Sequence, residues 1–330
     1  MLDHPEVVCA YELNGRGQGH EVNWDALLNW SQSKKPVWVH LDCAHEATEA
    51  WLRDVAKLDT FVIDGLLAEE SRPRCDAYDD GVLLVLRGVN LNPGADPEDM
   101  VSVRIWIDGK SVISTRFRHL MAVEDIRAQL AAGKGPVSTG HLVARLAASM
   151  TERMGPTIEE LSDLVVELED QLIGSDGGEP VELRDVRYKL IESRRVAIAL
   201  RRYINPQRDA LLRLSQLDEA WIDDRVLGRL RETVDRVTRI TEELDEIRER
   251  SAVVQDELAN RISQRMERTM YTLTVVATIM LPLGFITGLL GINVGGIPGT
   301  ESPWAFWAVC AGLVIIVVLE VIFLRRHKWI

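Results

Sequence analysis

Two long apolar runs lie near the C-terminal end of this 330-residue chain. The first, 270–290, contains no charged residue, and the second, 304–324, contains only Glu320. A run of about 20 apolar residues is long enough to cross the hydrocarbon core of a bilayer as a helix. A Gly- and Pro-rich segment, 291–303, joins the two runs. The pattern predicts two transmembrane helices that form a hairpin.

The charges that flank the two runs predict the orientation of this hairpin. The connecting segment contains no Lys or Arg and one acid, Glu301. Basic residues precede the first run and follow the second, in the tail 325–330: Arg261, Arg265, Arg268, Arg325, Arg326 and Lys328. Because positively charged flanks stay on the cytoplasmic side, we expect both termini in the cytoplasm and the connecting segment outside.

A helical pattern leads into the first apolar run without a proline between Pro206 and Pro282. We therefore expect one stalk helix over 206–269 that continues to residue 290, a total length of about 125 Å. Such a helix cannot bury an apolar seam alone, so the pattern favours contact with copies of the chain or with shorter helices. Apolar residues recur every three or four positions at Leu227, Leu230, Val234, Val237, Leu244, Ile247, Val254, Leu258 and Ile262.

Two shorter helices are expected before the stalk, in 151–205. Charged helical patterns cover 158–173 and 181–203, with a Gly-rich break at 174–178. Asn205 and Pro206 are expected to end the second helix, because proline disrupts a helix interior. The pattern predicts a pair of antiparallel helices.

Residues 1–150 show the alternating pattern of a mixed α/β domain. Strands are expected at 36–42, 81–88, 101–107 and 111–117, with an Asp-Gly hairpin turn at 108–109. Helices are expected at 47–58, 122–132 and 140–154. The predicted fold class is therefore an α+β cytoplasmic domain followed by a long helical stalk and two transmembrane helices.

Composition excludes several classes of function. The net charge of −13, much of it in the N-terminal part, argues against a nucleic-acid partner. This negative charge would attract cations or simply keep the protein soluble. The four cysteines form no CxxC pair, so neither a disulfide framework nor a zinc knuckle is indicated. No nucleophile elbow, P-loop or GxGxxG motif occurs, so we expect no enzyme.

One cluster in the α/β domain is a candidate metal site. His40, Asp42, Cys43 and His45 lie close together in the sequence, and His40 and Asp42 share one face of the expected strand. The spacing does not form an HExxH motif. Two interpretations remain open: His40, Asp42 and His45 bind a regulatory metal, or they are satisfied polar groups at a strand end.

One face of the first apolar helix is a candidate pore wall that ends near Asn293. Small residues on this face would permit close helix packing, and apolar rings would form a constriction that gates by dewetting. A packing or lipid-facing stripe would show the same periodicity. Asn293 and the backbone carbonyls nearby would supply oxygen ligands at the outer mouth. The face comprises Met270, Leu273, Thr274, Ala277, Leu281, Gly284 and Gly288.

At residues 274–299 the sequence TVVATIMLPLGFITGLLGINVGGIPG resembles the first transmembrane helix and signature of the CorA superfamily of divalent-cation transporters. GIN followed by VGGIPG, in place of GMN and an acidic loop, is similar to the zinc-transporting ZntB branch. The resemblance implies a CorA-like homopentameric funnel in the bacterial inner membrane. It makes Gly291, Ile292 and Asn293 the entrance ring, and it would turn Glu301 into a ring of carboxylates that attracts cations.

The resemblance implies Zn²⁺ as the transported ion, with Mg²⁺, Co²⁺, Ni²⁺ and Cd²⁺ as further candidates and no resident cofactor. The residue chemistry does not choose among them, because zinc sites use Cys, His or carboxylate ligands and the pore face has none. Two alternatives stay open: a Mg²⁺/Co²⁺ channel, and a membrane-anchored coiled-coil scaffold without transport. Glu320 is either a proton-linked group or a partner of Arg325 or Lys328.

Overall fold

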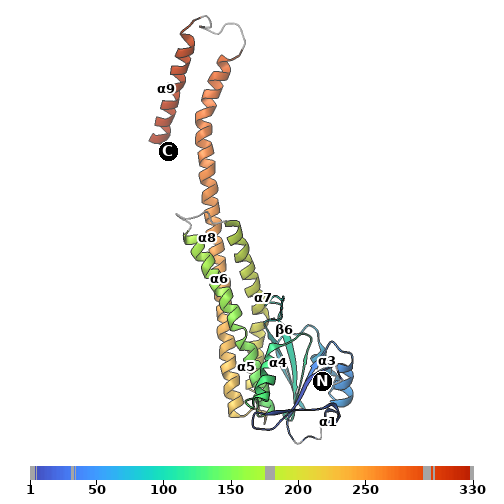
Figure 1. The fold of residues 1–330 in the computed structure, drawn as a ribbon. Coiled ribbons are helices and arrows are strands. Elements are labelled where there is room, and N and C mark those ends of the chain that lie inside the picture. The colour runs from blue at the N-terminus through green and yellow to red at the C-terminus, as the bar shows by residue number, and fades with distance from the viewer. Residues whose placement is uncertain are drawn as a thin grey trace. The chain divides into compact units, whose positions relative to one another are not determined.

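The computed structural model describes residues 4, 6–30, 33, 35–174, 183–292, 299 and 302–327. The chain divides into two compact units, Met1–Gln255 and Asp256–Ile330. Helix α8 (Asp224–Leu290) contributes to both of them (Figure 1).

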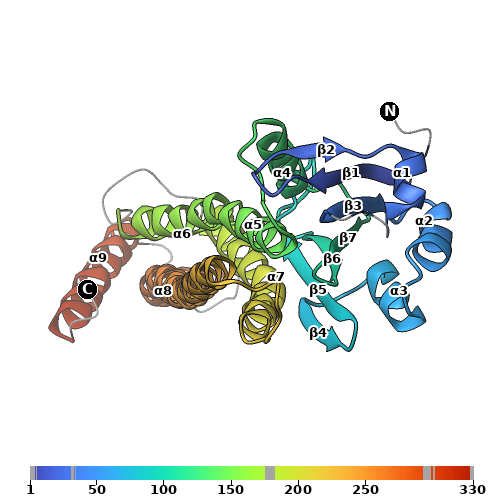
Figure 2. The same ribbon diagram turned by 90° about the horizontal axis from the view of Figure 1, so that it is seen from below.

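The first unit contains a seven-stranded sheet with the order β2-β1-β3-β7-β6-β5-β4 (Figure 2). Strands β3 and β7 are parallel, and the other neighbouring pairs are antiparallel. The predicted hairpin is confirmed, since Asp108 Oδ1 accepts a hydrogen bond of 2.9 Å from Lys110 N and Gly109 has a φ of 82°. The strands are β1 (Val7–Leu13), β2 (Gly19–Glu21), β3 (Val37–Asp42), β4 (Arg74–Tyr78), β5 (Gly81–Gly88), β6 (Val101–Ile107) and β7 (Ser111–Arg116).

Helices cover both faces of this sheet (Figure 2). Val39 and Trp106 point from the sheet into an apolar cluster with Trp51 and Leu66. That cluster lies under α1 (Trp24–Leu28), α2 (Ala47–Ala50), the π-helical turn η2 (Trp51–Val55) and α3 (Thr60–Leu67). The other face is covered by α4 (Met121–Ala131) and α5 (Thr139–Glu152). The expected α+β class is confirmed.

Three helices of the first unit pack together: α6 (Gly155–Gly174), α7 (Leu183–Ser215) and the first part of α8. Seam residues Leu230, Val237 and Leu244 are fully buried. Ion pairs join α8 to its neighbours, from Arg250 to Glu169 on α6 and from Asp245 to Arg201 on α7. The shorter helices of the same chain therefore cover this part of the seam, so its periodicity alone does not require other copies.

Two predicted helix boundaries are wrong. Helix α7 does not end at Pro206 but contains it and continues to Ser215. Residues beyond the proline, such as Leu211 and Leu214, are fully buried, and this packing offsets the cost of the missing backbone N–H. The stalk helix begins at Asp224 and not at residue 206. Just before Asp224, Asp223 Oδ1 accepts a 2.8 Å hydrogen bond from Val226 N. Such an N-cap marks a helix start.

The second unit contains the two predicted spans. Helix α8 continues through Pro282 to Leu290, and α9 covers Ala305–Arg326. Both helices are long and apolar enough to cross a membrane, and almost none of either apolar stretch is buried within the chain. Helix α8 ends at residue 290, where the first span was predicted to end, and α9 matches the predicted span at 304–324 to within two residues.

Candidate functional site

The predicted pore face lies on one uninterrupted stretch of α8. With 3.6 residues per turn, its seven residues fall on one side of the helix. Met270 is 58% exposed and Leu281 is 71% exposed. A Cβ atom added at Gly284 or Gly288 would have no heavy atom within 4 Å. The described residues of the chain therefore leave this face open along its whole length.

The opposite side of α8 is the shielded one. Its partly buried residues, among them Val275, Ile279 and Ile286, recur at helical spacing. Helix α9 has a matching stripe of partly buried residues that includes Leu313, Ile316, Val317 and Glu320. Since α8 and α9 are the helices described in this unit, each shields the stripe of the other. Helix α9 therefore covers the back of α8 and leaves the predicted pore face free.

The predicted entrance ring lies only partly within the described residues. Gly291 closes α8, because its N–H donates to Thr287 O at 3.0 Å. Ile292 is 49% exposed. Asn293 and Glu301 lie outside the described residues, so their roles stay predictions.

Threonines supply most of the polar side chains on this part of α8, and their donors are used within the helix. The Thr274 hydroxyl donates to Met270 O at 2.8 Å, and the Thr278 hydroxyl donates to Thr274 O at 2.8 Å. The Thr287 hydroxyl donates to Leu283 O at 2.8 Å. Such bonds to the preceding turn satisfy the hydroxyl proton locally. These side chains can therefore lie in an apolar environment without an unpaired donor.

Glu320 has an unusual environment on the stripe of α9 that faces α8. Its Oε2 atom is buried and has no hydrogen-bond partner among the described residues. The predicted pairing with Arg325 is not formed, and Lys328 lies outside the described residues. An unpaired carboxylate in an apolar segment is costly. Glu320 is therefore a titratable group without a described partner.

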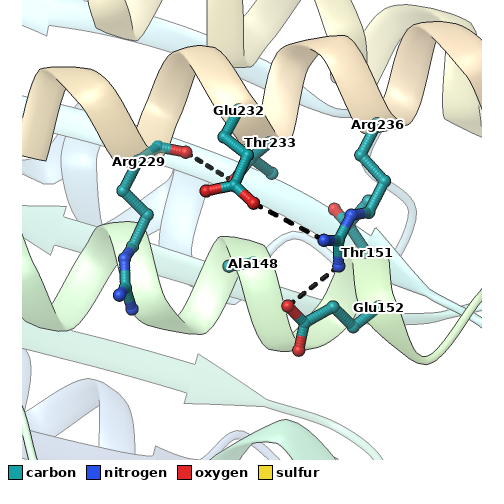
Figure 3. A pocket seen from close by; sticks show the side chains of 7 residues that line it. All are labelled: Ala148, Thr151, Glu152, Arg229, Glu232, Thr233 and Arg236. Atoms are coloured by element: carbon teal, nitrogen blue, oxygen red, sulfur yellow. Dashed lines mark hydrogen bonds and ion pairs between the residues drawn. The ribbon is translucent and has the colours of Figure 1, made fainter.

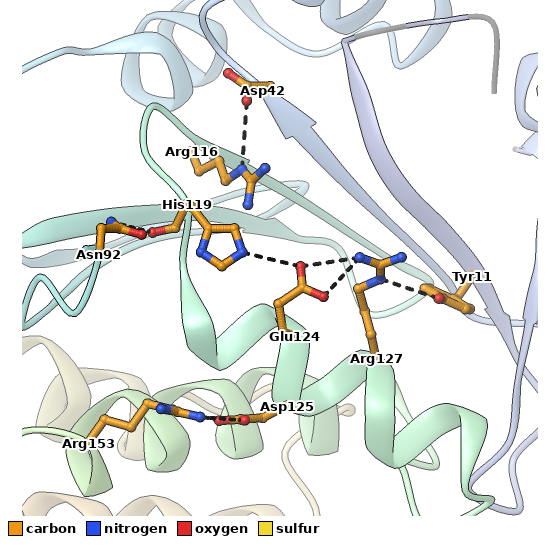
Figure 4. Close-up of polar contacts among 9 residues, drawn as sticks. All are labelled: Tyr11, Asp42, Asn92, Arg116, His119, Glu124, Asp125, Arg127 and Arg153. Atoms are coloured by element: carbon orange, nitrogen blue, oxygen red, sulfur yellow. Dashed lines mark hydrogen bonds and ion pairs between the residues drawn. The ribbon is translucent and has the colours of Figure 1, made fainter. Parts of the chain in front are cut away.

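The candidate metal site at His40, Asp42 and His45 is not assembled. His40 is fully buried on β3, and its Nδ1 lies 2.8 Å from Ser114 Oγ. Burial, followed by the charge of Arg116, lowers the pKa of His40 to about 3. Asp42 Oδ2 lies 3.7 Å from Arg116 Nε (Figure 4), and His45 is exposed.

The described residues contain no group of three or more His, Cys, Asp or Glu that could hold a metal ion. The structure does not bring these three residues together, because His40 turns into the sheet, towards Ser114, while Asp42 pairs with Arg116 and His45 faces solvent. The sequence could show the spacing of these residues but not that β7 would supply partners for two of them. The arrangement favours the alternative of polar groups at a strand end, although His40 Nε2 is buried without a hydrogen-bond partner among the described residues.

Polar contacts on the same face of the sheet attach α4 to it (Figure 4). Arg127 on α4 donates to Glu124 at 3.0 Å and to the Tyr11 hydroxyl at 3.5 Å. His119 Nε2 lies 3.7 Å from the same carboxylate. The contact of Arg127 with Tyr11 joins α4 to strand β1, while Glu124 holds Arg127 and the segment before α4 in place, so we interpret this network as structural.

Comparison with known proteins agrees with the fold and with the two apolar helices. The family described as CorA-like Mg²⁺ transporter protein matches residues 33–326. A divalent cation transporter, CmaX, from Pseudomonas aeruginosa is 40% identical over 331 residues, which cover 99% of this chain and 98% of the relative. A zinc transport protein, ZntB, from Pectobacterium carotovorum is 36% identical and covers 100% of this chain and 98% of the relative.

The structure of the full-length CmaX protein superimposes with a TM-score of 0.85 at 39% identity and covers 99% of each chain. The likeness therefore includes the sheet, the helical bundle and both C-terminal helices. The predicted CorA-like fold is confirmed. The chain belongs to the CorA-like family, as a divalent-cation transporter of the CorA/ZntB type.

Proposed function

We propose that this protein carries Zn²⁺ across the bacterial inner membrane, through a pore on the axis of a homopentamer. The observation that carries the proposal is the open face of α8, which lies opposite the stripe covered by α9. In a ring of copies this face would turn to the axis, and the α9 helices would form the outer layer.

The residue types on this face support a close ring of helices. Ala277, Gly284 and Gly288 have small side chains or none, which lets neighbouring helices approach. Met270 and Leu281 would form apolar rings, which hold back water and ions when the pore is narrow. The number of five copies comes from the resemblance to the CorA superfamily, and a head-to-tail contact that closes gives such a ring.

The chemistry of the face favours passage of an ion that keeps part of its water shell. The face offers no Cys, His or carboxylate, which are the usual zinc ligands. The backbone oxygens near Gly291 and the Asn293 carboxamide would contact bound water instead. Oxygen ligands suit Mg²⁺ as well as Zn²⁺, so the preference for zinc rests on the similarity to ZntB. A Mg²⁺/Co²⁺ channel is the second candidate.

The orientation follows from charge. Arg261, Arg265 and Arg268 precede the first span, and Arg325 and Arg326 end α9. Positive flanks remain on the cytoplasmic side. The first unit and both termini would therefore be cytoplasmic, and the segment after Leu290 would face the outside.

Flux measurements on the full-length protein in proteoliposomes test the proposal, with Zn²⁺, Mg²⁺ and the pH gradient varied independently. We expect saturable Zn²⁺ uptake that Asn293→Ala reduces strongly and Ser302→Ala, in the same connecting segment, does not. Preferential Mg²⁺ flux would favour the second candidate. If no divalent cation enters, the chain acts as an anchored scaffold and the proposal fails.

A further inference from the structure

A groove in the first unit is lined by several basic side chains that have no role in the proposed transport. It has a volume of about 400 Å³ and lies between α5 and the beginning of α8. Helix α5 contributes His141 and Arg145, and α8 contributes Asp224, Arg225, Gly228, Arg229 and Glu232. A smaller cavity of about 140 Å³ shares Arg229 and Glu232 with it (Figure 3).

Three arginines of this groove have no carboxylate partner. Arg145 donates to Gln129 Oε1 at 2.8 Å and to the backbone oxygen of Lys134. Within the described part of the chain, neither Arg225 nor Arg229 forms an ion pair. Figure 3 shows the Arg229 side chain extending towards α5, with no marked contact between its guanidinium and the other residues drawn.

Arg236, which lines the smaller cavity, differs from these arginines because it is paired with carboxylates. The Arg236 guanidinium lies 2.8 Å from a Glu152 oxygen and 3.6 Å from a Glu232 oxygen. Glu232 is therefore already engaged. Asp223 caps the first turn of α8 through Val226 N, and Asp224 lies in that first turn, where a negative charge is stabilised by the helix. Among the described residues, these acids form no ion pair with Arg145, Arg225 or Arg229.

The cations in this groove act on one another. The pKa of Arg145 is lowered, first by burial and then by the charge of Arg229. The pKa of His141 is lowered by burial and by Arg145, Arg229 and Arg225, although Asp223 opposes the shift. Arg225 and Arg229 are exposed, so water screens part of the repulsion between these cations, and a bound anion would relieve the rest. This arrangement is unexpected in a chain whose net charge is −13.

We propose that this groove binds a phosphate-bearing anion of nucleotide size. The planar guanidinium fork matches the geometry of phosphate oxygens and forms paired, charge-assisted hydrogen bonds with them. The groove lies near the start of a helix of 67 residues, but Asp223 already caps that end, so the phosphate contacts would come from the arginines. Its volume falls within the range of about 300–1,000 Å³ that small-molecule sites occupy. His141 adds a neutral hydrogen-bonding group beside the arginines.

Calorimetric titration of the full-length protein in detergent tests this site, with ADP and inorganic phosphate as separate probes in a low-salt buffer free of divalent cations. We expect ADP to bind more tightly than phosphate, and added NaCl to weaken both. Arg229→Gln should weaken ADP binding at least tenfold, and Arg225→Gln with Arg229→Gln should abolish it. Arg229→Lys keeps the charge but not the fork, so it should give an intermediate affinity.

The matched control is Arg231→Gln, because Arg231 is exposed and lies on the other side of α8 from Arg229. It should leave ADP binding unchanged. Equal loss in the Arg231 and Arg229 variants, or no binding of either probe, would overturn the proposal. Equal affinity for ADP and phosphate would contradict the proposal that the ligand has the size of a nucleotide.

A further outcome would also refute the site. If neither probe binds and Arg229→Gln dissociates the oligomer in size-exclusion chromatography, the groove holds an acidic surface of another copy. Unchanged melting temperatures of the variants show that they fold. The test does not depend on transport, because none of its readouts measures ion flux.

Discussion

The Gln207 Oε1 atom accepts a hydrogen bond of 2.7 Å from the backbone N–H of Arg87, which joins α7 to β5. Gln207 directly follows Pro206 and is 1% exposed. The guanidinium of Arg87 also lies 4.2 Å from the centre of the Tyr203 ring, one turn earlier on α7. The helical bundle and the sheet are therefore fastened together at the proline-containing turn, where a helix would otherwise be weakest.

Replacing Gln207 by alanine should destabilise the first unit. The Arg87 N–H would lose its partner in a buried position, which costs about 1–3 kcal/mol. Thermal denaturation of the full-length protein, followed by circular dichroism, measures the change. Gln216→Ala is the control, since Gln216 is exposed just after α7 and should leave the melting temperature unchanged. Equal melting of both variants would contradict the structural role of this hydrogen bond.

The stability of the protein should fall in acid partly through His40. Its pKa of about 3 in the folded chain lies below the ordinary value of 6.5, so the unfolded chain binds more protons between these two values. The contribution of neutral His40 is therefore complete above pH 6.5 and is lost as the pH falls towards 3. His40→Gln removes this titration, which should flatten the pH dependence by up to about 1.4 kcal/mol per pH unit.

Melting temperatures of wild type and His40→Gln between pH 7 and pH 4 measure this difference. The variant should be less stable than wild type near neutral pH, and the gap should narrow in acid. His45→Gln is the control, because His45 is exposed and lies on the same segment. Parallel curves for wild type and His40→Gln would show that His40 does not carry the acid sensitivity.

Cysteine labelling should distinguish the two sides of α8. In a background without Cys9, Cys43, Cys75 and Cys310, Leu281→Cys should react with a charged, water-soluble thiol reagent and lose most of its ion flux. Ile279→Cys, on the stripe covered by α9, should neither react nor lose flux. Reaction at both positions, or at Ile279→Cys alone, would place the pore elsewhere.

Glu320→Gln tests the link between ion flux and protons. The variant keeps the size of the side chain but cannot exchange a proton, so Zn²⁺ flux should lose its dependence on the pH gradient while flux without a gradient persists. Uptake in proteoliposomes with and without the gradient measures both. Glu257→Gln, at an acid that pairs with Arg261 at 2.9 Å, is the control. Unchanged gradient dependence in Glu320→Gln would exclude a proton-linked role.

Periodicity predicted the strongly patterned elements well. Strands β5 and β6 have the expected bounds, because each is an apolar run closed by a clear turn signal. Strand β4 was missed, since Arg74–Tyr78 alternates charged and small residues and presents only Cys75 as a buried side chain. The end of α7 was predicted wrongly at Pro206. Local propensity could not show that Gln207 would bond to the sheet and that Leu211 would be buried in the helical bundle.

For the candidate site too, the sequence predicts some features, and others depend on packing between distant segments. The open face of α8 follows from helical spacing, but Val275 and Ile279 are as apolar as Leu281, so only the position of α9 shows which side is free. Arg145 and Arg229 belong to different helices, α5 and α8, far apart in the sequence, and no local pattern brings them together. His40 and Asp42 do share a face of β3, yet their partners come from β7.

The internal bonding of the threonines has a consequence for charge discrimination. Because the Thr274 hydroxyl gives its proton to Met270 O, its oxygen would offer only lone pairs to an ion in the proposed pore. Water molecules around a cation point their hydrogens outwards and can donate to such an oxygen. Water molecules around an anion point their oxygens outwards and would find no donor there. A ring of these hydroxyls would therefore accept the hydration shell of a cation and oppose that of an anion, without any fixed charge.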